Sequence, residues 1–186
     1  LNQGSWLDSA IMSISVSGMS IPTFWLGLLL IMLFSVRLSW FPSISNDNSP
    51  AALILPALTL GLPEAAVVAR MVRAGMLDVL GKEYVTVARA KGLREHKVVF
   101  DHAMRNALIP IVTFIGLQTA YLLGGSAIVE TLFARQGIGR LAVQSISNRD
   151  YPMVQGVVLV VAVIYVLINT FTDILYTVLN PKIRLK

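Results

Sequence analysis

Long apolar stretches, separated by short polar segments, dominate the hydropathy pattern of this chain. A helix needs about 20 mostly apolar residues to cross the hydrocarbon core of a bilayer. Four stretches reach that length, at residues 11–36, 51–76, 108–129 and 152–172. The last two contain no charged residue, and neither helices nor strands of soluble cores give uncharged runs of this length. The pattern therefore predicts four membrane-spanning helices in one all-α, polytopic membrane bundle.

The amino-acid composition also indicates that lipid surrounds most of the protein surface. Of the 186 residues, 55% are hydrophobic and only 13% are charged, and the mean hydropathy is +0.72. A soluble domain of this composition could not cover itself with polar groups. There is no cysteine, so disulfides and thiolate metal sites are excluded.

The positive charge is clustered, and the clusters predict the orientation in the membrane. Eight of the 15 Lys and Arg residues lie between residues 70 and 105, and three more lie between 182 and 186. Cytoplasmic loops carry an excess of Lys and Arg, so both regions are expected inside, and both termini with them. The segment 39–50 has no Lys or Arg, which suits the outer face. We interpret the net charge of +5 as membrane topology and expect no nucleic-acid partner.

The central basic loop, at about residues 82–97, predicts two short helices joined by a sharp turn. Residues 82–91 suit a helix, Gly92 stands where that helix would end, and a second helix starts near Arg94. Glycine adopts the left-handed conformation that closes a helix without a steric penalty. Four residues of the first helix are spaced to share one face: Tyr84, Val85, Ala88 and Lys91. Two interpretations stay open, a plain basic loop on an amphipathic helix or a knob that docks into a soluble partner.

The order of residues in this loop favours the second interpretation. It contains two blocks, Tyr84-Val85-x-x-Ala88-Arg89-Ala90-Lys91-Gly92-Leu93 and His102-Ala103-x-Arg105-Asn106-Ala107-Leu108-x-Pro110. They resemble the cytoplasmic loop of binding-protein-dependent permeases, in particular the dipeptide/oligopeptide/nickel permease family of ABC importers. The general pattern there is Glu-Ala-Ala, three residues, Gly, nine residues and Ile-x-Leu-Pro, of which only Ala88 and Gly92 match. The residues that depart from this general pattern resemble those of the peptide-permease branch, and they argue against a sugar or amino-acid permease.

Four further blocks resemble the same family in the same order, so the likeness covers nearly the whole chain. They are Pro22-x-Phe24-Trp25-Leu26-Gly27, Leu55-Pro56-Ala57-Leu58-Thr59-Leu60-Gly61-Leu62-Pro63, Val129-Glu130-Thr131-x-Phe133-x-x-x-Gly137-Ile138-Gly139-Arg140-Leu141 with Arg149-Asp150-Tyr151-Pro152, and Asp173 with Asn180-Pro181-Lys182. The family has two more spans at its N-terminus. The resemblance therefore implies that the chain is truncated there.

This resemblance implies a MetI-like ABC transporter permease fold in a bacterial or archaeal inner membrane. It implies a permease subunit that forms the translocation pathway for di- and oligopeptides, with nickel or glutathione as alternative cargo. The implied partners are a second homologous permease subunit, two ATP-binding subunits and an extracytoplasmic substrate-binding protein. The residues implied to couple to the ATPases are Tyr84, Val85, Ala88, Arg89, Ala90, Lys91, Gly92 and Leu93.

The second apolar stretch holds the candidates for lining a pathway: Pro56, Gly61, Pro63 and Glu64. A carboxylate within a membrane span is costly and is a functional candidate, but the favoured interpretation of Glu64 is a protonated or hydrogen-bonded packing residue that faces a neighbouring helix. Paired with Asp173, it also suggests a rival class, a secondary transporter coupled to ions by its carboxylates. In the third stretch, Gly116 and its small and polar neighbours favour helix packing over substrate contact. Asn169 lies four residues before Asp173, so the two are expected to pair with polar groups inside the bundle.

Nothing in the sequence predicts catalysis by this chain. No phosphate-binding Gly-x-x-x-x-Gly-Lys-[Ser/Thr] loop and no pairing of a nucleophile with a base occurs. His96 and His102 flank no carboxylate–histidine cluster, so neither is expected to bind a metal. We therefore expect no cofactor and no bound metal, and we expect ATP hydrolysis to belong to separate chains.

Overall fold

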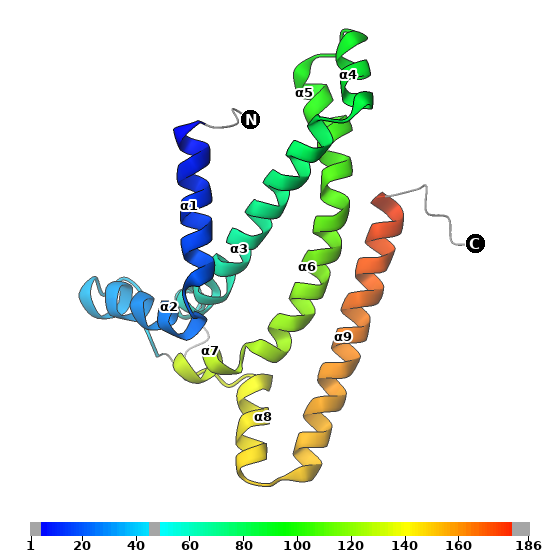
Figure 1. The fold of residues 1–186 in the computed structure, drawn as a ribbon. Coiled ribbons are helices and arrows are strands. Elements are labelled where there is room, and N and C mark those ends of the chain that lie inside the picture. Colours follow the sequence, from blue (N-terminus) through cyan, green and yellow to red (C-terminus); the bar gives the residue numbers. More distant parts are fainter. Residues whose placement is uncertain (1–4, 45–48, 180–186) are drawn as a thin grey trace. The chain divides into compact units, whose positions relative to one another are not determined.

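The computed structural model describes residues 5–44 and 49–179, and within these ranges the chain is helical with no strand (Figure 1). The elements are α1 (Trp6–Ser20), α2 (Thr23–Leu30), the π-helix η1 (Ile31–Arg37), α3 (Ala51–Leu80), α4 (Glu83–Ala90), α5 (Glu95–Lys97), the π-helix η2 (Val98–Met104), α6 (Arg105–Gly125), α7 (Ala127–Leu132), α8 (Ile138–Ser147) and α9 (Tyr151–Leu179). The predicted all-α fold is confirmed. The basic tail at 182–186, Asn46 and Asn180 lie outside the described residues.

The chain forms two compact units. The first combines residues 1–67 with 120–165, and the second combines residues 68–119 with 166–186. Three long helices, α3, α6 and α9, are divided between the units, so that each has one part in the first unit and one part in the second.

The predicted stretch 11–36 is divided in the structure. Helix α1 ends at Ser20, Ile21 is extended with φ −86° and ψ 122°, and α2 begins after Pro22. The cause is local, because a residue before proline is pushed out of the helical region. At the other end of α1, Ser5 caps the helix by accepting a hydrogen bond from the Asp8 backbone N–H at 3.2 Å.

The first unit is held together by an apolar core between α2, α3 and α7. Its buried members are Leu30, Leu55, Val129 and Phe133. Gly27 allows the close approach of α2, because a β-carbon there would lie 3.1 Å from the Thr59 methyl and closer still to Leu132. Thr59 is fully buried and donates its hydroxyl to the Leu55 carbonyl at 2.7 Å, which satisfies its polar atom within the helix.

The second unit joins the C-terminal part of α3, α4, α5, η2 and the adjoining parts of α6 and α9. Its buried core consists of Met76, Val79, Val85, Ala88, Val98, Ala103 and Ala107. Gly116 of α6 is buried directly against the side chain of Thr172 in α9, with no room for a β-carbon. The expectation that Gly116 serves helix packing agrees with this contact.

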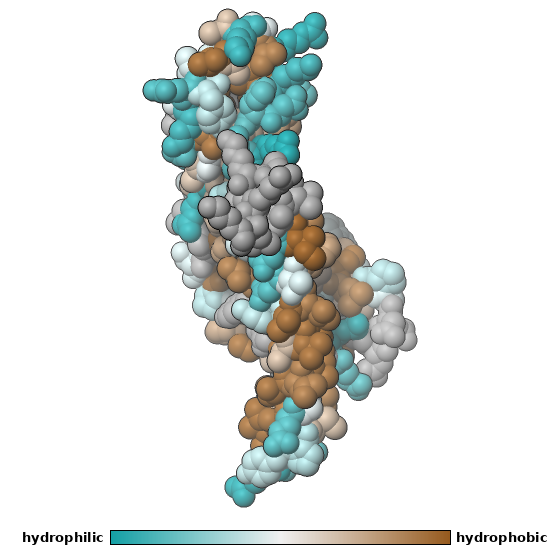
Figure 2. Space-filling model, turned by 90° about the vertical axis from the view of Figure 1, so that its right-hand side faces the viewer, coloured by the Kyte–Doolittle hydropathy of each residue, from teal (hydrophilic) through white to brown (hydrophobic). Residues whose placement is uncertain are grey.

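Two helices of the described residues are long and apolar enough to cross a membrane, Ala51–Leu80 and Tyr151–Leu175. A third span results if Glu95–Leu108 and Pro110–Thr119, bent by 48°, count as one. The first part of α9 exposes apolar side chains such as Val158, Leu159 and Val163, and Figure 2 shows this surface ending in hydrophilic residues at the α8–α9 loop. Four crossings at the boundaries given above stay a prediction.

Candidate functional site

Gly92 creates the turn of a compact helical hairpin, residues 82–97, which we call the Gly92 hairpin (Figure 1). Its φ is +76°, in the left-handed region that favours glycine. The Leu93 N–H bonds to the Ala88 carbonyl at 3.4 Å, and the Gly92 N–H bonds to the Arg89 carbonyl at 2.9 Å. These two bonds form a Schellman motif at the end of α4. The predicted helix end and the left-handed Gly92 are both confirmed.

One face of α4 is buried and fixes the hairpin to its own unit. Val85 is completely buried and Ala88 nearly so, against Val79 of α3 and Val98 and Ala103 of η2. Full burial of a valine side chain stabilises by roughly 1.5–3 kcal/mol, so Val85 is a substantial anchor. A movement of the hairpin would therefore move the ends of α3 and η2 with it.

Polar contacts fix the hairpin further. Arg89 forms a two-point ion pair with Glu95 across the turn, Nε to Oε2 at 3.1 Å and Nη2 to Oε1 at 2.7 Å. The hydrogen bond from Arg89 lowers the pKa of Glu95, and the same bond raises the pKa of Arg89. Asn106 Nδ2 donates to the Tyr84 hydroxyl at 3.1 Å and to the His102 carbonyl at 2.9 Å, which ties α4 to the start of α6.

The other face of the hairpin is exposed and combines positive charge with apolar side chains. Figure 2 shows hydrophilic and hydrophobic residues side by side at α4 and α5. Its exposed side chains include Tyr84, Val87, Arg89, Ala90, Lys91, Leu93 and Arg94. Phe100 extends this surface and stacks on His96, with ring centroids 4.5 Å apart. Of the predicted coupling set, Val85 and Ala88 therefore anchor the hairpin, and the other members are exposed.

The predicted pathway residues lie on the part of α3 that belongs to the first unit. Gly61 is exposed with open space where a β-carbon would stand, whereas Pro56, Pro63 and Glu64 are half-buried. Within the described ranges, Oε2 of Glu64 is buried and has no hydrogen-bond partner. Both interpretations of Glu64, as a protonated or hydrogen-bonded packing residue and as a pathway residue, therefore stay predictions.

A second polar arrangement lies around Glu130 of α7, in the segment 129–151 between the third and fourth apolar stretches, which is the predicted outer segment if both termini are inside. Its carboxylate accepts hydrogen bonds from the Ser126 hydroxyl at 2.7 Å and from the Arg140 backbone N–H at 2.6 Å. It caps α8, whose own N-cap residue, Gly137, has no side chain to do so. A β-carbon at Gly137 would collide with this carboxylate. Glu130 had no predicted role, because a side chain that caps another helix leaves no local pattern in the sequence.

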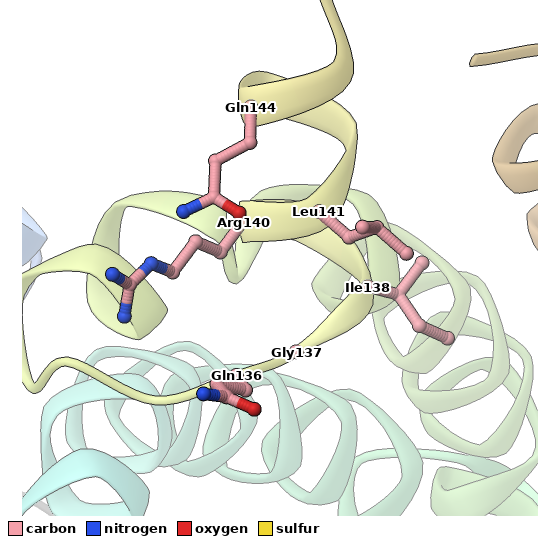
Figure 3. Close-up of a pocket in the computed structure, with 6 residues that line it drawn as sticks. All are labelled: Gln136, Gly137, Ile138, Arg140, Leu141 and Gln144. Atoms are coloured by element: carbon pink, nitrogen blue, oxygen red, sulfur yellow. The ribbon is translucent and has the colours of Figure 1, made fainter. Parts of the chain in front are cut away.

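Beside this cap, the first turns of α8 border a cavity of about 440 Å³. Its lining consists of Gln136, Gly137, Ile138, Arg140, Leu141 and Gln144 (Figure 3). A more apolar cavity of about 340 Å³ lies between α2, α7 and α8, lined by Phe24, Ala127, Ile128, Thr131, Leu132 and Val143. The first has a cation and two side-chain amides, and is therefore the one equipped for a polar ligand.

The chain belongs to the family of binding-protein-dependent transport system inner membrane components, whose family model matches residues 1–185. Among its relatives is the glutathione transport system permease protein GsiC of Pectobacterium atrosepticum, 50% identical over 184 residues, which is 99% of this chain and 60% of the relative. The GsiC protein of Escherichia coli K12 is 50% identical over 181 residues, or 97% of this chain and 59% of that protein. The chain thus spans about 60% of the length of these relatives. The family resemblance stated from the sequence is confirmed.

Proposed function

We propose that this chain is part of the permease of an ABC importer and forms a translocation pathway for small peptides. Its family and its 50% identity to proteins named glutathione transport permeases support this class of cargo. Glutathione is itself a small peptide, so it becomes the first cargo to test. Nickel is a weaker candidate, because no relative reported above is named for it.

The observation that carries this proposal is the construction of the Gly92 hairpin. It has an exposed, cationic outer face and a buried inner face that includes Val85. A protein that grips the outer face would pull on the ends of α3 and η2 through this core. Separate ATP-binding subunits are the proposed partners, and they can drive a change only by binding two states of the permease with different affinity.

The remaining partners of the proposal are a second homologous permease subunit and an extracytoplasmic substrate-binding protein. Loaded binding protein would deliver the peptide to the side of the membrane opposite the Gly92 hairpin. The chain itself would hydrolyse nothing, and its work would be to connect ATP binding to opening of the pathway. Orientation with both termini inside the cell belongs to the same proposal.

A second candidate function rests on Glu64. Its buried Oε2 lacks a hydrogen-bond partner in the described part of the chain, which is a costly arrangement for a carboxylate within a membrane helix. Such a group would suit a proton- or sodium-coupled transporter. That function would require transport by this polypeptide without ATP.

The deciding experiment is import into proteoliposomes that contain the complex purified from its native membrane. Radiolabelled glutathione and trialanine are supplied outside with the binding protein, and ATP is varied inside. We expect uptake only when ATP and binding protein are both present. Uptake that follows a proton or sodium gradient without ATP would contradict the proposal and support the second candidate.

A further inference from the structure

The cavity beside α8 presents a set of side chains suited to one kind of ligand (Figure 3). Arg140 and Gln144 come from successive turns of α8 and extend to the same side of it, and Gln136 comes from the preceding loop. Ile138 and Leu141 project to the other side and form an apolar part of the lining. The volume of about 440 Å³ falls in the range of roughly 300–1,000 Å³ typical of small-molecule sites.

The guanidinium of Arg140 is the strongest recognition group in this cavity. Across the described residues, its side chain has neither an ion pair nor a hydrogen-bond acceptor, although the residue is half-buried. The planar guanidinium offers parallel N–H donors that match the two oxygens of a carboxylate. The amides of Gln136 and Gln144 can donate to and accept from peptide groups next to that carboxylate.

The backbone around Arg140 is held in place before any ligand arrives. Glu130 binds the Arg140 backbone N–H and the Ser126 hydroxyl, and Gly139 packs against Ala127 with its β-carbon position 2.8 Å from that backbone. The start of α8 is therefore already capped by an anion. The positive charge available to a ligand is the guanidinium itself, and its base is fixed in position, which lowers the entropy cost of binding.

We propose that this cavity receives the free carboxylate of the peptide cargo, with Arg140 as the binding group and Gln136 and Gln144 as its polar neighbours. The proposal rests on the proposed function, because it assumes that the cargo is a peptide. It extends that function by assigning a cargo-binding site to the predicted outer segment, apart from the α3 residues suggested by the sequence.

The test compares trialanine with its C-terminal amide in the reconstituted complex. Each peptide is supplied at a concentration that saturates the binding protein, and initial import is measured for the parent and for Arg140→Gln. Arg149→Gln is the matched control, since it removes the same charge from the same segment outside the cavity lining. The amount of assembled complex and its ATPase activity with loaded binding protein show whether Arg140→Gln folds and docks.

We expect Arg140→Gln to lower import of trialanine by roughly tenfold or more, which is the effect of losing a charged hydrogen-bonded pair. Import of the amide should change less than about twofold, and Arg149→Gln should leave both peptides unaffected. Equal losses for the two peptides would overturn the inference, because Arg140 would then act in docking or gating. Equal import by Arg140→Gln and the parent would overturn it too. Failure of the parent complex to import any peptide would instead contradict the proposed function.

Discussion

At the scale of single residues, two glycines are required for different reasons. At one the backbone conformation disfavours a side chain, and at the other a neighbouring residue leaves no room for one. Gly92 has open space around it but a φ of +76°, whereas Gly116 is buried against Thr172. The same substitution should therefore act through different physical causes. Substitution of Gly92 should change the shape of the hairpin, and substitution of Gly116 should disturb the packing of α6 against α9.

Substitution of Gly92 by valine should reduce transport without reducing the amount of protein in the membrane. A residue with a β-carbon pays roughly 1–2 kcal/mol in the left-handed conformation, so the hairpin should shift to another turn. The measurement is import and ATPase coupling at matched amounts of complex. Gly81→Ala is the control, because its β-carbon would make only ordinary contacts, at 3.6 Å from the Asp78 carbonyl oxygen. Normal import with tightly held ATPases in Gly92→Val would show that the hairpin is only a solvated loop.

Glu64→Gln should retain most of the import activity if this residue is structural. Glutamine keeps the shape of the side chain and can still form hydrogen bonds, while it removes a carboxyl group whose Oε2 has no hydrogen-bond partner among the described residues. Uptake of labelled peptide at matched expression is the measurement. Complete loss of uptake with normal expression would place the carboxylate on the pathway and revive the ion-coupled transporter.

At the scale of elements, the strongest test lies at the crossing of α6 and α9 in the second unit. Gly116→Ala should lower the amount of folded protein, because its β-carbon would overlap the Thr172 side chain. Overpacking of this kind costs typically 1–3 kcal/mol. Thermal unfolding of the detergent-solubilised protein gives the readout, with Gly156→Ala in open space of α9 as control. Adding Thr172→Ala should restore part of the loss, and the absence of any rescue would refute this contact as the cause.

The Arg89–Glu95 pair should make the order of the Gly92 hairpin depend on pH at the acidic end. The hydrogen bond from Arg89 holds the pKa of Glu95 below its ordinary value of 4.5. A lowered pKa means that the stabilisation is complete above the ordinary value and is lost as the pH falls through the lowered one. The effect should be small, because both side chains are exposed. The protection factors for amide exchange at Gly92 and Leu93, which correct for the intrinsic pH dependence of exchange, should fall at acidic pH in the parent, and Glu95→Gln should remove that dependence. An identical pH profile in the variant would show that the Arg89–Glu95 pair is not the cause of the pH dependence.

Sequence patterns predicted the elements whose cause is local and missed those whose cause is not. The Gly92 turn follows from one glycine after a helical run, and it was predictable. Pro22 was visible in the sequence, yet the length of apolar residues around it suggested one continuous span. The Glu130 cap joins residues ten positions apart, so it had no local signature. The two π-helices likewise left no pattern that we could interpret.

At the scale of the whole molecule, the orientation in the membrane is the prediction on which the roles of both regions depend. Under the two proposals, the Gly92 hairpin would meet ATP-binding subunits from the cytoplasm, and the Arg140 cavity would receive delivered peptide from outside. Positive charge supports this arrangement, with eight Lys and Arg residues between 70 and 105 and none in the segment 39–50. The two proposals would therefore fail together if the chain were inverted.

Single-cysteine labelling tests this orientation directly, and the chain has no cysteine of its own to interfere. In intact cells with the outer membrane made permeable, a membrane-impermeant maleimide should label Asn46→Cys and should not label Lys91→Cys or Lys186→Cys. Lys91 is exposed in this chain, so in cells that lack the proposed ATP-binding subunits, protection of its cysteine would reflect the membrane and not burial. Opening the inner membrane should make Lys91→Cys reactive, which is the internal control. Labelling of Lys91→Cys before that step would place the Gly92 hairpin outside the cell, where no ATP-binding subunit could reach it.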